Sequence, residues 1–142
     1  MRTPPLTRFL ETAIYVDDVA ASRAWYGQVL GLRPLNPASD DPRICALGMP
    51  GGQVFLLFKK GGSVETLRFE GGTIPPSDAR GTTHFAFAIE ESELAAWRAH
   101  LAAQGVAIEG EMRWERGGTS VYFRDPDGHL AELVTPGVWP TY

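Results

Sequence analysis

The fold is decided by the stretch Glu11-Thr-Ala-Ile-Tyr-Val-Asp-Asp18 and by the residues that follow it as far as Gly31. Residues 9–16 alternate between two faces, as in a β-strand, and one face carries a single carboxylate, that of Glu11, among apolar neighbours. The Asp-Asp pair offers a helix N-cap, apolar residues then recur at helical spacing, and Gly31 supplies the stop. The stretch therefore predicts a strand followed by an amphipathic helix.

Three more strands are expected before residue 60. Residues 43–47 and 53–58 alternate as strands around a Pro-Gly-Gly turn at 50–52, and a short strand is predicted near 32–35. The first part of the chain thus has the order strand, helix, three strands.

The same order returns after residue 82. The pattern predicts a strand at 83–89, a helix capped by Glu91 and Ser92 and stopped by Gly105, and strands at 106–108, 120–124 and 130–134. The offset is 73 positions from Glu11 to His84 and 74 from Gly31 to Gly105. A near-constant offset across a strand and a helix stop predicts a duplicated βαβββ module.

Residues 1–142 are expected to form one domain, with one module at 8–60, a loop at 61–82 and a second module at 83–136. The stretch 59–81 contains paired glycines and prolines and no sustained period, which is typical of a linker or of a lid that closes over a ligand.

Composition excludes several classes of function. The net charge of −4, with basic residues scattered along the chain, removes the electrostatic basis for binding nucleic acid. No stretch approaches the ~20 apolar residues of a membrane span, so a cytoplasmic protein that binds no membrane is expected. A single cysteine, Cys45, excludes an internal disulfide and cannot alone form a thiolate zinc site.

Three residues stand out as candidate metal ligands. Glu11 and His84 occupy equivalent positions in the repeat, and Glu132 is the one charge in an otherwise apolar strand, where its first-module counterpart is about Leu56. A buried carboxylate costs several kcal/mol unless a cation compensates it. One imidazole and two carboxylates would neutralise a divalent ion. Taken singly, each residue also has an ordinary structural interpretation.

Aromatic residues on or near the strands are candidates to line a substrate pocket, although such residues are also common in cores. These are Tyr15, Phe55, Trp114 and Tyr122. Arg113, beside Trp114, could pair with an anionic substrate or lie in a solvated turn. The turn chemistry of Pro-Asp-Gly explains residues 125–128 without any function, and His129 is expected to be exposed.

Four segments resemble the vicinal oxygen chelate superfamily, which includes glyoxalase I, fosfomycin-resistance enzymes, extradiol dioxygenases and bleomycin-resistance proteins. They are Glu11-Thr-Ala-Ile-Tyr-Val-Asp-Asp18, Trp25-Tyr-Gly-Gln-Val-Leu-Gly-Leu32, Gly81-Thr-Thr-His-Phe-Ala-Phe87 and Tyr122-Phe-Arg-Asp-Pro-Asp-Gly-His-Leu-Ala-Glu-Leu133. The resemblance implies an α+β fold in which two paired βαβββ modules form a U-shaped mixed sheet around a metal site.

Residue by residue, the resemblance assigns the metal ligands to Glu11, His84 and Glu132. The chain departs from the family pattern at Glu11, where a histidine is usual, and at Leu56, which cannot supply the fourth ligand of glyoxalase I. Glu11 is therefore a ligand or, alternatively, a general base. The ion is expected to be Mn²⁺, Fe²⁺, Ni²⁺, Zn²⁺ or Mg²⁺.

The function implied is that of a divalent-metal-dependent enzyme, a lyase, isomerase or dioxygenase, whose small substrate chelates the metal through neighbouring oxygens. The alternative is a binding protein that sequesters a small molecule without catalysis, as bleomycin-resistance proteins do. Because relatives commonly cover their long sheet edges by dimerising, a homodimer is also expected.

Overall fold

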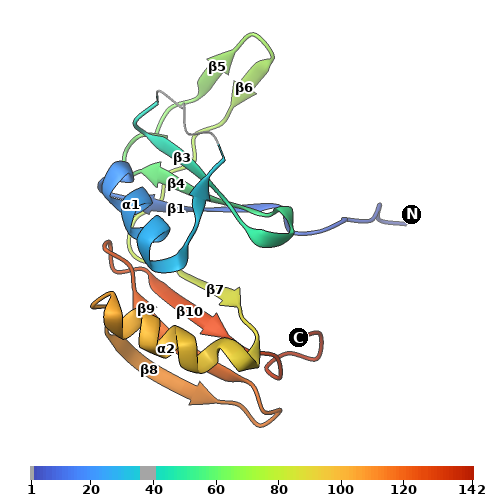
Figure 1. Ribbon diagram of the computed structural model, residues 1–142. Coiled ribbons are helices and arrows are strands. Elements are labelled where there is room, and N and C mark those ends of the chain that lie inside the picture. The colour runs from blue at the N-terminus through green and yellow to red at the C-terminus, as the bar shows by residue number, and fades with distance from the viewer. Residues whose placement is uncertain (1, 36–40) are drawn as a thin grey trace. The chain divides into compact units, whose positions relative to one another are not determined.

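Each half of the repeat forms a four-stranded mixed sheet (Figure 1). The computed structural model describes residues 2–35 and 41–142. Contacts divide the chain into a first unit, Met1–Arg23 with Leu32–Ala79, and a second unit, Ala24–Gly31 with Arg80–Tyr142. The predicted α+β class and its two βαβββ modules are confirmed.

The first unit has the sheet order β1-β4-β3-β2, with β1 parallel to β4. The helix that follows β1 begins as predicted, because the Asp18 carboxylate accepts a hydrogen bond from the backbone N–H of Ala21 at 2.9 Å. It ends before Gly31, whose φ of +70° is the left-handed conformation that favours glycine. The elements are β1 (Glu11–Val16), α1 (Val19–Leu30), β2 (Arg33–Pro34), β3 (Ile44–Gly48), a 3₁₀ turn (Pro50–Gly52) and β4 (Val54–Lys59).

The second unit repeats this plan in the order β7-β10-β9-β8. Its elements are β7 (His84–Ala88), α2 (Leu94–Ala103), β8 (Ile108–Arg113), β9 (Thr119–Arg124) and β10 (Leu130–Val134). The predicted cap of α2 is wrong, because Glu91 and Ser92 lie in a 3₁₀ turn, Glu91–Glu93, that leads directly into the helix. The strand predicted at 106–108 instead begins at Ile108 and extends to Arg113.

The strand register confirms that the two modules are equivalent. Glu11 is the first residue of β1 and His84 the first residue of β7. Two positions further along each strand, Ala13 pairs with Leu56 and Ala86 pairs with Glu132. Leu56 is therefore the counterpart of Glu132, as the sequence predicted.

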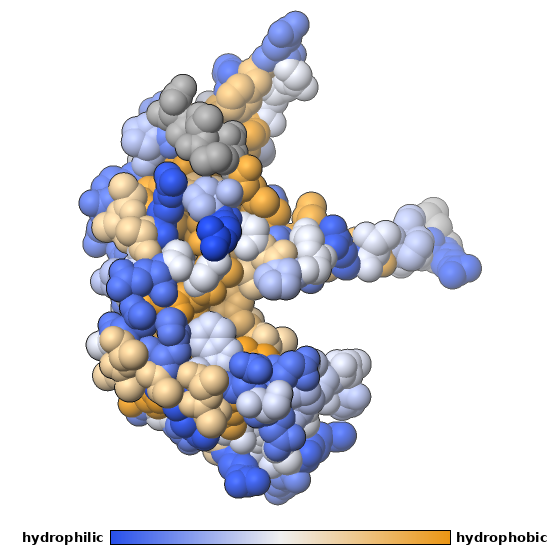
Figure 2. All heavy atoms as spheres, viewed as in Figure 1, coloured by the Kyte–Doolittle hydropathy of each residue, from blue (hydrophilic) through white to orange (hydrophobic). Residues whose placement is uncertain are grey.

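The stretch between the modules is more regular than expected. It contains a β-hairpin of β5 (Leu67–Phe69) and β6 (Gly72–Ile74) whose strands are too short to give a sequence period. At its base, the Tyr15 hydroxyl donates a hydrogen bond to the Ser77 carbonyl at 2.5 Å. The hairpin exposes apolar side chains, among them Phe69 and Ile74. Figure 2 shows apolar as well as polar spheres along this part of the chain. The expectation of a lid remains a prediction.

The core of the second unit lies between α2 and one face of its sheet (Figure 1). It also takes in residues of the second half of α1, such as Val29, and Trp25 and Trp97 pack against it. These two tryptophans therefore contribute to the core of this chain. Among the described residues, no helix combines the length and the apolar character needed to cross a membrane.

Candidate metal centre

The two faces of the second unit's sheet have different chemistry. Four alternate residues of β9 and β10 belong to the core beneath α2, namely Val121, Phe123, Ala131 and Leu133. The other set includes Tyr122, Glu132 and His84, whose side chains lie on the opposite face by strand alternation. In the register, Glu132 stands between Ala86 of β7 and Tyr122 of β9. Polar and aromatic groups thus gather on the face that α2 does not cover.

His84 and Glu132 form a close pair on this face. The His84 Nε2 atom lies 3.1 Å from the Glu132 Oε2 atom, and the Glu132 side chain is 10% exposed. The His84 Nδ1 atom lies 3.0 Å from the Leu130 carbonyl oxygen. Because a carbonyl only accepts, Nδ1 carries a proton, and Nε2 faces the carboxylate oxygen. Either a second ring proton or a cation must lie between Nε2 and this oxygen.

The donor chemistry fits a divalent cation. Ligand atoms about 2.1 Å from an ion and at right angles to each other are about 3 Å apart, close to the separation of Nε2 and Oε2. The hydrogen bond from Nδ1 to a carbonyl is also the outer-shell contact that fixes the tautomer of ligating histidines. No group of three or more His, Cys, Asp and Glu side chains is arranged as a metal site in residues 2–35 and 41–142. The second unit alone supplies two donors.

The third predicted ligand belongs to the first unit. Glu11 is exposed at the start of β1, and strand alternation places its side chain on the same face as those of Ala13 and Leu56. Leu56 supplies no donor atom, so Glu11 is the one titratable side chain in this group of three.

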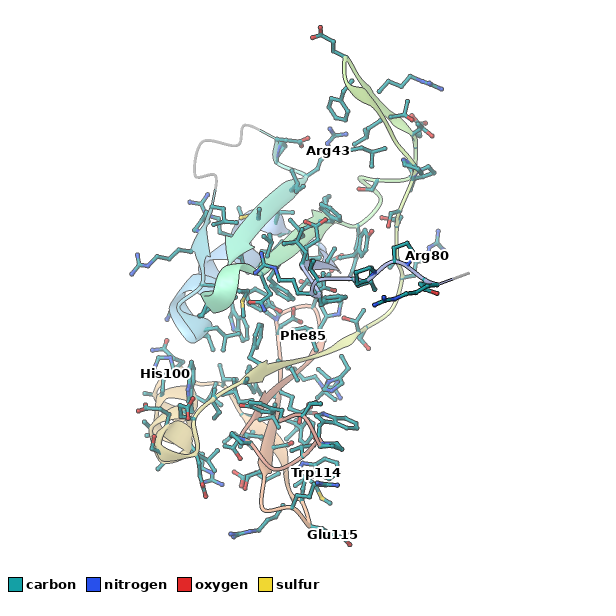
Figure 3. The ribbon with its side chains drawn as sticks, turned by 90° about the vertical axis from the view of Figure 1, so that its right-hand side faces the viewer. Arg43, Arg80, Phe85, His100, Trp114 and Glu115 are labelled. Carbon is teal, nitrogen blue, oxygen red and sulfur yellow. The ribbon has the colours of Figure 1, made fainter. Side chains whose placement is uncertain are left out.

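Two of the predicted pocket residues lie on the face that carries Glu132. Tyr122 is half-buried, and its ring centroid is 6.3 Å from that of His84. Trp114, labelled in Figure 3, lies in the turn between β8 and β9, and its indole Nε1 donates a hydrogen bond to the Ser120 hydroxyl at 2.8 Å. Ser120 precedes Tyr122 by two residues and shares its face.

The other three lie elsewhere. Phe55 is 3% exposed and alternates with Leu56, so it is a core residue on the face opposite Glu11. Arg113 pairs with Thr119, which places its exposed side chain on the α2 side of the sheet and away from Glu132. Tyr15 shares the face of Glu11 but is buried beneath Ser77, to which its hydroxyl is hydrogen-bonded.

A buried polar network was missed by the sequence interpretation. The Asp125 carboxylate accepts hydrogen bonds from the Tyr26 hydroxyl at 2.8 Å and from the backbone N–H groups of Asp127 and His129. Burial, and secondly the charge of Asp125, raise the pKa of Tyr26 far above its usual range. His129 was predicted to be exposed but is fully buried, and its Nδ1 accepts a hydrogen bond from the Thr83 N–H. The one signal of this network in the sequence is the Asp-x-x-x-His spacing of Asp125 and His129, which places the His129 N–H within reach of the Asp125 carboxylate.

Comparison with known families agrees with this arrangement. The model of the Glyoxalase/Bleomycin resistance protein/Dioxygenase superfamily matches residues 8–133. The chain belongs to this superfamily. Among solved structures, this superfamily member is similar to a lactoylglutathione lyase from Agrobacterium tumefaciens, with 30% identity, a TM-score of 0.85, and coverage of 96% of this chain and 99% of that one.

Similarity to curated members of the superfamily is local. The metallothiol transferase FosB of Shouchella clausii is 53% identical over 55 residues, which cover 37% of this chain and 38% of that protein. The glutathione transferase FosA of Serratia marcescens is 38% identical over 60 residues, covering 42% of this chain and 40% of that protein. The chain thus matches less than half the length of these relatives.

Proposed function

We propose that this superfamily member is an enzyme that depends on one divalent metal ion and acts on a small substrate that binds the ion through two neighbouring oxygens. The observation that carries the proposal is the His84–Glu132 pair, in which the imidazole Nε2 atom lies 3.1 Å from an oxygen of a largely buried carboxylate. Two acceptors in contact require a cation or a proton, and Glu132 lies in a strand with no other charge.

Within the proposed site, His84 and Glu132 hold the ion and Glu11 supplies the third donor or acts as a general base. The proposal for Glu11 is supported by its equivalence to His84 in the repeat. A bound divalent ion would act as a Lewis acid that stabilises negative charge on a substrate oxygen. The names of three relatives, one lyase and two transferases, favour such Lewis-acid chemistry over activation of oxygen.

The two roles of Glu11 are separated by substitution. Glu11→His is expected to preserve metal binding and to shift preference toward metals that favour imidazole, because it gives the set two histidines and one carboxylate. Glu11→Gln is expected to weaken binding as much as loss of His84 if Glu11 is a ligand, and less if it is chiefly a base. Competition titrations with Mn²⁺ and Ni²⁺ measure both effects. Unchanged preference in Glu11→His would remove Glu11 from the ligand set.

We also propose that the protein is a homodimer. Each four-stranded sheet leaves its outer strands at an edge, β1 and β2 in one unit and β7 and β8 in the other. Such edges are usually covered, and the described chain also exposes large apolar side chains such as Leu6, Phe9 and Phe69. Light scattering at micromolar concentration should give twice the chain mass of 15.5 kDa, and a value equal to the chain mass would contradict the proposal.

A further inference from the structure

Three side chains form an apolar strip beside the His84–Glu132 pair. The strip consists of Met112, Trp114 and Tyr122. Tyr122 pairs directly with Glu132 across β9 and β10, and Met112 pairs with Ser120, two residues along β9 from Tyr122. Paired residues of antiparallel strands share a face, so Met112 lies on the face of Tyr122. Met112 is 44% exposed and the two aromatic residues are half-buried, so the strip is open to a ligand.

Trp114 has a fixed place in this strip. Its indole N–H donates to the Ser120 hydroxyl at 2.8 Å, and its backbone N–H donates to the Gly118 carbonyl at 2.8 Å. A tryptophan held at both its ring and its backbone presents a preformed aromatic surface, so little conformational entropy is lost when a ligand packs against it. Ser120 therefore positions the ring.

Basic side chains of this sheet are directed elsewhere or already paired. Apart from His84, the strands β7 to β10 carry two basic residues, Arg113 and Arg124. Arg113 lies on the α2 side of the sheet. Arg124 donates to the Glu109 carboxylate at 2.5 Å and to the Gly128 carbonyl at 3.1 Å. The strands of this face therefore offer no unpaired guanidinium to a second anionic group on the substrate.

We infer that the substrate class is an oxygen chelator whose remaining part is an uncharged aromatic or apolar group, selected by Trp114 and Tyr122. This inference rests on the proposed function, because the chelating oxygens must be held at the His84–Glu132 pair. The remaining part of the substrate then lies along the strip, where aromatic packing and loss of apolar surface from water stabilise the complex.

Matched hydroxamates test this inference, since each chelates a metal through two neighbouring oxygens. Benzohydroxamate carries a phenyl group, acetohydroxamate a methyl group and succinate monohydroxamate an additional carboxylate. Calorimetric titration of the Mn²⁺-loaded full chain measures the affinity for each compound. Trp114→Ala should lower the affinity for benzohydroxamate about tenfold, as expected for loss of one aromatic contact and its buried area. The same substitution should lower the affinity for acetohydroxamate less than about twofold. Arg113→Ala, the neighbouring substitution on the other face, should leave the affinities for all three hydroxamates unchanged.

The hydrogen bond to Ser120 is tested by a double-mutant cycle. In the native chain, Ser120→Ala should lower the affinity for benzohydroxamate about threefold, as expected for loss of one hydrogen bond. In a chain that already carries Trp114→Phe, Ser120→Ala should leave this affinity unchanged, because the indole N–H is absent. If benzohydroxamate affinity is independent of Trp114 while Mn²⁺ and acetohydroxamate still bind, the assignment of substrate class is overturned. If neither Mn²⁺ nor any hydroxamate binds the native chain, the proposed function fails, and this inference fails with it.

Discussion

Glu132→Ala is expected to abolish stoichiometric binding of a divalent ion, and His84→Ala is expected to do the same. Each substitution removes one of two donors that face each other at 3.1 Å in the second unit. A site with one protein ligand fewer binds divalent ions weakly, because water must replace the lost ligand. Equilibrium dialysis against Mn²⁺, followed by metal analysis, measures the occupancy.

Glu111→Ala provides the matched control for Glu132→Ala. Glu111 lies on the same sheet, but its carboxylate pairs with Arg98 of α2 at 2.7 Å, on the opposite face from Glu132. The control should bind metal as the native chain does. Full occupancy in Glu132→Ala would remove Glu132 from the site, and equal loss in both variants would indicate a nonspecific effect of removing charge.

Asp125→Ala is expected to destabilise the protein by about 3 kcal/mol, because it leaves the buried Tyr26 hydroxyl and two backbone N–H groups without their acceptor. For a chain of 142 residues this corresponds to a fall in Tm of about 10 °C. Tyr26→Phe removes only one donor and keeps the ring, so its cost should be about 1–2 kcal/mol. Thermal and urea unfolding followed by circular dichroism measure both.

Asp127→Ala is the control within the same turn. The Asp127 side chain is half-buried, and its backbone N–H bond to Asp125 survives the substitution. We expect a cost well below that of Asp125→Ala. If Asp125→Ala unfolds with the native Tm, the network does not stabilise the second unit and the turn is held by its backbone alone.

The sequence predicted the repeat well because a strand, a cap and a glycine stop are local signals. β1 and α1 follow from alternation, from the Asp18 cap and from the left-handed conformation at Gly31. The sequence also predicted that Leu56 and Glu132 are equivalent, because a near-constant offset between the modules indicates which positions of their strands correspond.

The errors concern properties that depend on contacts distant in the chain. His129 looked like an exposed turn residue because its Thr83 partner lies 46 positions earlier. Phe55 and Arg113 are pocket candidates in the sequence, with a core position and a solvated turn as their alternatives, and the face that each occupies depends on a strand pairing that the sequence pattern does not reveal. The contact between Trp114 and Ser120 is nearer, but it needs the turn between β8 and β9 to bring the two together.

Metal content of the native chain tests the central claim most directly. The full chain is dialysed against Mn²⁺, separated from free ion by gel filtration and analysed for metal and protein. We predict one divalent ion per chain, with His84 signals in a nuclear magnetic resonance spectrum broadened by the paramagnetic ion. A chain that retains no ion, while still binding small molecules, would contradict the account and identify the protein as a metal-free binding member of the superfamily.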